Sequence, residues 1–151
     1  MPSAIAGELL VRQATAEELP RLEAMYASFE PKEVALGLPS RDPERRREWL
    51  KRLLEGINFV GVIDSVVVGH LAIMPSGHAG ELACFVHQDY RWRGVATAMG
   101  NAAVADARRR GLRSLWVLIS SDNSPARSAL LNYGFHTAWE CQGEMKMTFA
   151  L

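Results

Sequence analysis

The sequence predicts a single α/β domain over residues 1–151, with a mixed central sheet of about seven strands and helices on both faces. A chain of 151 residues suffices for one good hydrophobic core. The hydrophobic fraction of 48% and the charged fraction of 23% are those of an ordinary globular protein. Apolar residues recur in stretches that switch between a period of two and helical spacing, which is typical of strands alternating with helices.

The first strand and helix are predicted near the N-terminus. Leu9–Ala14 is a mainly apolar run that predicts a strand. Thr15 followed by Glu18 has the spacing of a capping box, which opens a helix carrying apolar residues as far as Phe29. Residues 30–41 contain prolines and glycine and predict a loop.

A second helix is predicted to begin at Asp42–Pro43, because aspartate caps a helix and proline at the first helical position loses no hydrogen bond. Apolar residues up to Leu54 form one face. The other face is basic and consists of Arg45, Arg46, Arg47, Lys51 and Arg52. We expect this face to be solvated, with the steering of an acidic partner as the alternative.

Three strands are predicted next. Residues 57–63 and 66–74 flank a break at Asp64–Ser65, and residues 80–87 form the third strand after a turn at Pro75–Gly77. Gly69 inside the second strand predicts a bulge or the close approach of another backbone.

The C-terminal part repeats the alternation. A helix is predicted from residue 95 to the run Arg108–Gly111, followed by an apolar strand over residues 113–119 that is buried on both faces. Asn123–Pro125 opens a short helix that Gly134 ends. Two last strands are marked by Trp139 and Cys141 in one, and by Met145, Met147 and Phe149 in the other.

Charge and composition narrow the function classes. Lys+Arg and Asp+Glu both total 17, so the net charge is zero, which argues against direct nucleic-acid binding. The N-terminus lacks a secretory pattern and no apolar run could span a bilayer, so no membrane partner and a cytoplasmic location are expected. Cys84 and Cys141 are expected to be reduced core thiols. The histidines show no ligand spacing, and no metal is expected. The oligomeric state is left open, with a homodimer included.

The most informative stretch runs from Phe85 to Ala96. It predicts a buried strand, a short polar turn, and then Arg91-x-x-Gly94-x-Ala96 at the start of a helix. A glycine turn at a helix start presents several free backbone N–H groups, and the positive end of the helix dipole points the same way. The stretch therefore predicts a cradle for an anion such as pyrophosphate, with two arginines beside it.

In its motifs the chain resembles the GNAT family of N-acetyltransferases. The matching residues are Val86–Thr97, for the acetyl-CoA turn, and Asn123-x-x-Ala126 with Gly134-Phe135 for a later element. The resemblance implies the family's fold, with a splayed pair of central strands. It also implies acetyl-CoA, or another acyl-CoA, as the donor.

The expected cofactor contacts follow from the cradle and from the resemblance together. Backbone amides around the turn would take the pyrophosphate, and the strand edge at Phe85 and Val86 could pair with the amides of the pantetheine arm. Asn123 resembles the family asparagine that hydrogen-bonds this arm. The full expected set is Phe85, Val86, Arg91, Trp92, Arg93, Gly94, Val95, Ala96, Thr97 and Asn123.

The expected reaction is direct attack of an amine on the thioester, for which the amine must first lose a proton. Glu81 is the candidate base, and the Val86 N–H is the expected donor to the thioester oxygen. Gly80-Glu81 and the tail residues 143–147 resemble the small bacterial and archaeal protein lysine acetyltransferases, in which a glutamate at this position is the proposed base. Leu130 stands where many members have a tyrosine acid, and Tyr133, three residues on, is the candidate replacement.

The sequence is consistent with three functional hypotheses. The chain could acetylate a protein lysine, acetylate a small amine such as a polyamine, amino acid or drug, or serve as a non-catalytic acyl-CoA sensor. The loop over residues 30–41 and the helix over residues 42–54 are expected to form the acceptor wall, and their sequence does not identify the acceptor.

Overall fold

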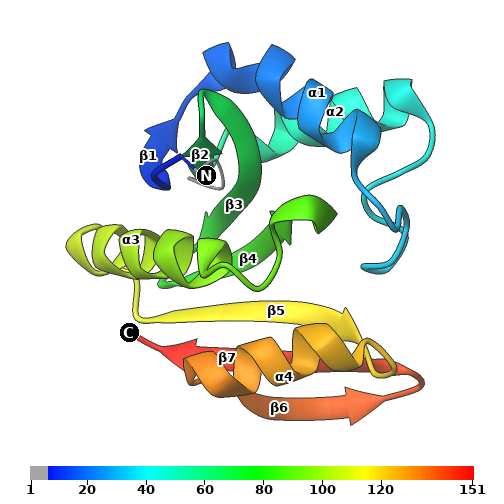
Figure 1. Cartoon of the computed structure of the whole chain (residues 1–151). Helices are drawn as coiled ribbons and strands as arrows, with labels where there is room; N and C mark the ends of the chain where they lie inside the picture. The colour runs from blue at the N-terminus through cyan, green and yellow to red at the C-terminus, as the bar shows by residue number, and fades with distance from the viewer. Residues whose placement is uncertain (1–6) are drawn as a thin grey trace.

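The computed structural model describes residues 7–151 and confirms the predicted mixed α/β architecture (Figure 1). One seven-stranded sheet has the order β1-β2-β3-β4-β5-β7-β6. Its strands are β1 (Leu10–Ala14), β2 (Ile57–Ile63), β3 (Val66–Ser76), β4 (Ala79–Val86), β5 (Ser114–Ser120), β6 (His136–Cys141) and β7 (Glu144–Ala150). The helices are α1 (Leu19–Ser28), α2 (Pro43–Leu53), α3 (Val95–Arg109) and α4 (Ser124–Tyr133), with short 3-10 turns at η2 (Ala16–Glu18) and η3 (Gln88–Tyr90).

Helices pack on both faces of the sheet, and the molecule has two hydrophobic cores. One core lies under α3 and includes Val95, Met99 and Leu115. The other lies under α1 and α2 and includes Tyr26, Trp49 and Phe85. Strand β4 contributes to both, because alternate side chains of a strand point to opposite faces.

Gly69 has the structural role that the sequence predicted. The β2–β3 register shifts beside it, between Gly61 and Val62. A Cβ built on Gly69 would lie 2.8 Å from side-chain atoms of both Val95 and Met99. Glycine at this position therefore lets α3 pack directly against the sheet, and α3 in turn begins at the predicted anion cradle.

Several sequence predictions are corrected by the structure. Pro75 and Ser76 continue strand β3, so the predicted turn lies at Gly77 instead. Thr15 accepts a hydrogen bond from the Glu17 N–H, while the Glu18 carboxylate binds Arg12, so the capping box does not form. Cys141 is exposed on β6 and is not a core thiol. Cys84 does behave as one, since burial raises its pKa to about 12.

A buried chain of hydrogen bonds joins four elements beneath the α1–α2 core. Tyr26 Oη lies 2.8 Å from His70 Nδ1, His70 Nε2 lies 2.7 Å from Asn58 Oδ1, and Asn58 Nδ2 donates to the carbonyl oxygen of Leu53. Since Asn58 Oδ1 can only accept, Nε2 must carry the imidazole proton, and Nδ1 accepts from the tyrosine. All the polar atoms are thus satisfied by a neutral histidine, and burial lowers the pKa of His70 to about 3.

This neutral histidine predicts that the fold loses stability in mild acid. Below pH 6.5 His70 binds a proton in the unfolded chain but stays neutral in the folded one. Its contribution to the free energy of unfolding is therefore fully present above pH 6.5 and is lost as the pH falls towards 3. The free energy of unfolding should decrease by about 1.4 kcal/mol between pH 7.5 and 5.5 from this group. Urea denaturation at the two pH values measures the change. His78→Gln, in an exposed turn, should retain it, whereas titration of the His70 ring by NMR near pH 6 would contradict the assignment.

Candidate active site

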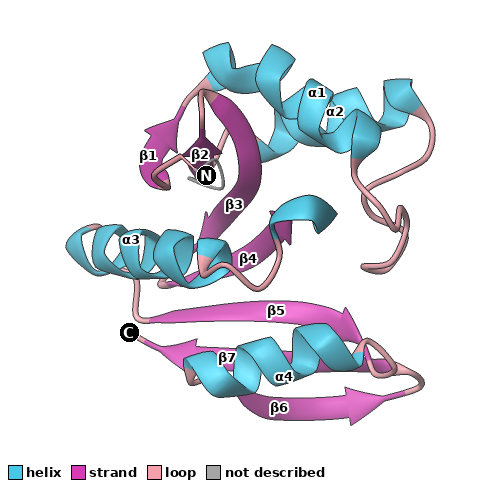
Figure 2. Ribbon diagram, viewed as in Figure 1, coloured by secondary structure: helices cyan, strands magenta, loops and turns pink. Residues whose placement is uncertain are grey.

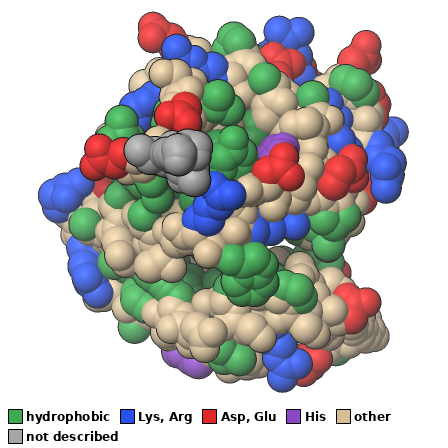
Figure 3. Space-filling view, in the orientation of Figure 1, with side chains coloured by type: hydrophobic (Ala, Val, Ile, Leu, Met, Phe, Trp, Pro, Cys, Tyr) green, Lys and Arg blue, Asp and Glu red, His purple; other side chains and the backbone are tan. Residues whose placement is uncertain are grey.

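The central strands β4 and β5 separate after a short parallel seam. Their only paired residues in the described part of the chain are Ala79–Glu81 with Ser114–Trp116. Strand β4 continues to Val86 and β5 to Ser120 without pairing to one another, so a gap opens in the middle of the sheet. The space-filling view is hollowed between the two halves of the molecule (Figure 3). The splayed strands that the resemblance implied are therefore present.

The backbone of Val86 faces this gap. The His87 N–H donates to the carbonyl oxygen of Val68, and Val86 lies opposite Gly69. In an antiparallel ladder this makes Val86–Gly69 a non-hydrogen-bonded pair, so the N–H and C=O of Val86 point away from β3. The C=O accepts from Arg91 Nε, and the N–H faces the gap. Phe85 has the opposite arrangement: its backbone pairs with His70, and its side chain is buried under α1 and α2. Its predicted contact with the cofactor stays a prediction that this geometry does not favour.

The predicted anion cradle stands at the start of α3. Gly94 is the N-cap residue with φ +80°, and it supplies no side-chain cap. The first helical bond runs from the Ala98 N–H to the Gly94 carbonyl oxygen, so the N–H groups of Val95, Ala96 and Thr97 remain available to a ligand. A Cβ on Gly94 would meet no atom within 4 Å, which leaves room for a pyrophosphate over the turn.

The cradle opens into a groove of about 800 Å³ between α3 and α4, the size of a cofactor site. Residues from the expected cofactor set line most of its upper wall: Val86, Arg91, Trp92, Gly94, Val95, Ala96 and Thr97. The opposite wall comes from small residues of α4, among them Ala126 and Ala129, which the sequence analysis had not assigned to the site. Arg93 and Asn123 do not line the groove.

Trp92 is an unusual member of this set. Its side chain is 95% exposed and its backbone lies in the left-handed region, with φ 64°. Such a conformation costs a non-glycine residue about 1 kcal/mol. The ring borders the groove mouth and touches neither hydrophobic core.

The two arginines of the turn are held by the protein itself. Arg91 Nε donates to the Val86 carbonyl oxygen, its Nη2 donates to the Glu30 carbonyl oxygen, and its guanidinium lies 5.2 Å from the centre of the Phe29 ring. Arg93 lies over the Tyr90 ring at 5.5 Å. Arg91 therefore fastens the turn to the end of α1, and the helix N–H groups rather than its guanidinium remain available to an anion.

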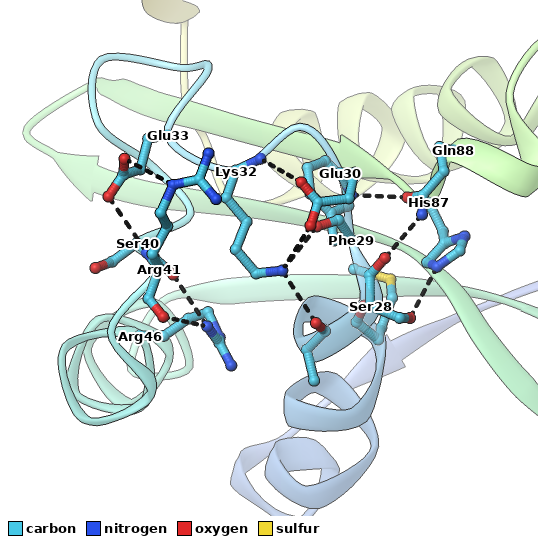
Figure 4. A network of polar contacts seen from close by, with 12 residues as sticks. Ser28, Phe29, Glu30, Lys32, Glu33, Ser40, Arg41, Arg46, His87 and Gln88 are labelled. Carbon is cyan, nitrogen blue, oxygen red and sulfur yellow. Dashed lines mark hydrogen bonds and ion pairs between the residues drawn. The ribbon is translucent and has the colours of Figure 1, made fainter.

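A second link joins the same two segments (Figure 4). Gln88 Nε2 donates to the Ser28 carbonyl oxygen at 2.7 Å, and Gln88 Oε1 accepts from the Glu30 N–H at 2.8 Å. His87 Nε2 also lies 2.9 Å from Ser28 Oγ. The Gln88 amide thus holds the chain on both sides of Phe29. The expected acceptor wall begins at this point.

The loop that follows is ordered by its own polar contacts (Figure 4). The buried Arg46 guanidinium donates to the carbonyl oxygens of Ser40 and Arg41. Lys32 Nζ donates to the carbonyl oxygens of Ala27 and Phe29. The expectation of a fully solvated basic helix face is therefore wrong for Arg46, whose charge satisfies loop carbonyls instead.

Removing the Gln88 side chain should loosen this wall. Gln88→Ala deletes two hydrogen bonds that hold residues 28–30, so we expect the loop to open more often while the fold remains intact. Limited trypsin cleavage at Lys32 and Arg41 should become roughly fivefold to tenfold faster, the effect of losing one net hydrogen bond. Gln142→Ala, in the exposed β6–β7 turn, is the control. Unchanged cleavage in Gln88→Ala would show that the clamp contributes nothing.

Glu81 lies at the inner end of the gap. The β3–β4 register is unbroken, so no bulge intervenes and Glu81 shares its face with Ala83 and Phe85, the α1–α2 side of the sheet. Its side chain is exposed, and its neighbour across the parallel seam is Trp116. A carboxylate in this position can reach a molecule that enters the gap from that side.

Asn123 and Tyr133 occupy the two ends of α4. Asn123 Oδ1 caps α4 by accepting from the Ala126 N–H, which leaves its Nδ2 donor for a ligand. Tyr133 Oη donates to Asn101 Oδ1 of α3 at 2.8 Å, and its ring packs against Phe149. Burial raises the pKa of Tyr133, so the phenol stays protonated, as an acid must.

The sheet has a parted central pair, with a glycine-capped helix and a groove beside it, which is the arrangement expected for an acyl-CoA-dependent transferase. The model of the acetyltransferase (GNAT) family matches residues 20–135, and the chain belongs to this family. The chain is therefore a member of an acetyltransferase family.

Solved structures share the fold at low sequence identity. The GNAT domain of PAT from S. lividans has a TM-score of 0.82 at 18% identity, over 93% of this chain and 89% of that chain. PaiA N-acetyltransferase from Thermoplasma acidophilum, in complex with coenzyme A, has a TM-score of 0.80 at 16% identity, over 95% and 99%. YncA from Salmonella typhimurium, a putative acetyltransferase with its cofactor acetyl-CoA, has a TM-score of 0.72 at 18% identity, over 95% and 94%.

Two negative findings apply to residues 7–151. No helix there is long and apolar enough to cross a membrane. No group of three or more histidine, cysteine or acidic side chains in this range could hold a metal ion.

Proposed function

We propose that the chain transfers the acetyl group of acetyl-CoA directly to a primary amine, with Glu81 as the general base. The observation that carries the proposal is the position of Glu81 at the inner end of the β4–β5 gap, on the face opposite the α3 core. Acetyl-CoA would lie with its pyrophosphate on the start of α3 and its pantetheine arm along the free backbone of β4. Its thioester would then reach the level of Glu81.

Each residue has a defined task in this reaction. Glu81 takes a proton from the amine, directly or through water, so that the nitrogen lone pair can attack the thioester carbon. Val86, the donor expected from the sequence, lies five residues from Glu81 along an unbroken strand, a distance of about 16 Å, so the two cannot act on the same carbon. The Cys84 N–H, in a non-hydrogen-bonded pair with Leu71, also points into the gap and lies nearer Glu81, and it donates to the thioester oxygen as it gains charge. The departing thiolate is a good leaving group, since the pKa of a thiol is only about 8.5. Tyr133 remains the candidate acid, and solvent is the alternative.

The acceptors expected from the sequence, a protein lysine and a small amine, both present a primary amine to the same base. The resemblance to lysine-modifying members favours a protein lysine. Because one fold serves many activities, the contacts that this chain makes with a bound acceptor decide between a protein lysine and a small amine. Acetylation of a protein lysine is therefore one arm of the test and acetylation of a small amine is the other.

A mass-spectrometric screen tests the proposal. Wild-type protein is incubated with acetyl-CoA, a mixture of small amines and a set of lysine-containing peptides, and products heavier by one acetyl group are identified. We expect at least one acetylated amine and release of free coenzyme A. Tight binding of acetyl-CoA without transfer to any amine would instead support the sensor hypothesis.

A further inference from the structure

One face of the C-terminal sheet carries large apolar side chains that belong to neither core. In β5, Leu115 and Ile119 pack under α3, while Trp116 and Leu118 point to the other face and pack against neither core. Lys146 of β7 lies opposite Leu118, and Trp139 of β6 lies opposite Lys146. We call these four residues, Trp116, Leu118, Lys146 and Trp139, the open sheet face.

The open sheet face begins beside the proposed base. Glu81 and Trp116 are partners across the parallel seam and therefore lie on the same face of the sheet. On this side α1 and α2 cover β1, β2, β3 and β4, because the core beneath them includes Ala14 of β1 and contains no residue of β5, β6 or β7. Helix α4 lies along the other face of these three strands (Figure 2). Trp139 is accordingly 44% exposed.

Lys146 gives this face a positive charge, and the carboxylates of Glu81 and Glu144 lie on the same face. Its Nζ lies over the Trp116 ring, 4.7 Å from the ring centre, and the side chain is only partly exposed. Within residues 7–151 no carboxylate lies within 4 Å of it. A cation–π contact contributes about 0.5–1 kcal/mol at such a site and does not neutralise the charge. The geometry thus leaves an ammonium ready for an anionic group of a ligand.

We infer that the open sheet face binds the acceptor, and that the acceptor is an apolar amine carrying a carboxylate within a few bonds of its amino group, such as a free apolar amino acid. The carboxylate binds Lys146, the apolar part lies on Trp116 and Trp139, and the amino group faces Glu81. A protein lysine has no such carboxylate, and its own ammonium would be repelled by Lys146. This inference rests on the proposed function and adds the chemical class of the acceptor.

Matched acceptors test the inference. L-phenylalanine, L-leucine and L-methionine are each compared with the amine that lacks the carboxylate, such as phenethylamine for phenylalanine, at saturating acetyl-CoA. We expect kcat/KM to favour the amino acid by about tenfold to a hundredfold, the effect of one charge-assisted hydrogen bond. Lys146→Gln should erase the preference, Lys146→Glu should reverse it, and Lys146→Arg should keep it.

Controls separate this inference from the proposed function. Arg113→Gln, an exposed loss of a positive charge just before β5, should leave the preference intact, and the affinity for acetyl-CoA should be equal in all variants. Acetylation of both members of a pair at equal rates, or of lysine peptides alone, would overturn the inference while the proposed function stands. Failure to acetylate any amine would overturn both. If Lys146→Glu shifts the oligomeric state in sedimentation without altering selectivity, the face is a subunit interface and the inference is wrong.

Discussion

Replacing Gly94 with glutamate should abolish acetyl-CoA binding while the protein remains folded. Gly94 caps α3 with a left-handed backbone and open space above its Cα, so a side chain there fits the ligand-free molecule but projects into the pyrophosphate position. The new carboxylate would also repel the phosphates at the point where α3 offers its free N–H groups. We expect the dissociation constant to rise at least about 100-fold, which corresponds to about 2.7 kcal/mol. Isothermal titration with acetyl-CoA measures it.

Gly111 provides a matched control for this variant. It lies just after α3 with φ +84°, and a Cβ there also meets no atom within 4 Å. Gly111→Glu therefore carries the same backbone strain and the same added charge, but at the other end of the helix. Both variants should lose about 1 kcal/mol of stability, and only Gly94→Glu should lose the ligand. If Gly94→Glu still binds acetyl-CoA with the wild-type affinity, the turn at Gly94 is not the pyrophosphate site.

The second large effect is expected at Glu81. Glu81→Gln keeps the shape of the side chain and removes its ability to accept a proton, so kcat should fall by about 10²–10⁴-fold near neutral pH. The remaining activity should rise with pH, because the acceptor amine then loses its proton in solution. The affinity for acetyl-CoA should not change, since the cradle lies at the other end of β4. A pH profile of kcat for wild type and variant measures these effects.

Glu55→Gln, an exposed carboxylate after α2, is the control for charge removal. If Glu81→Gln retains the wild-type rate and pH profile, the base is another group, and His87 at the end of β4 becomes the next residue to change.

Local chemistry explains why most elements could be predicted from the sequence. Asp42 and Pro43 start α2 as their own backbone preferences require, and the apolar run Ile57–Ile63 forms β2 with the predicted bounds. Pro75 was misleading, because proline usually ends a strand. It is tolerated here since it lies in a non-hydrogen-bonded pair with Gly80, and β2 begins too late to pair with its other side.

The anion cradle could be predicted from sequence for the same reason, because glycine and helix start are adjacent in the chain. The contacts of Arg91 could not, since its partner Glu30 is 61 residues away. Arg46 and the Gln88 clamp likewise depend on how the loop folds back on the sheet. The sequence places Trp116 in an apolar strand and Lys146 in a later one, but it does not show that they meet. Their contact depends on the register between β5 and β7, which the structure provides.

The short seam between β4 and β5 has a thermodynamic consequence. Within residues 7–151 the two parts of the sheet share only three residue pairs there, and a ligand whose amides bond to the free edge of β4 would fill the place of missing strand pairing. Bound acetyl-CoA would then help to hold the two parts of the sheet together, so the melting temperature should rise with acetyl-CoA concentration. Substitutions at the seam, such as at the closely packed Gly80, do not contact acetyl-CoA. They should still alter its affinity, because they change the angle between the two parts of the sheet.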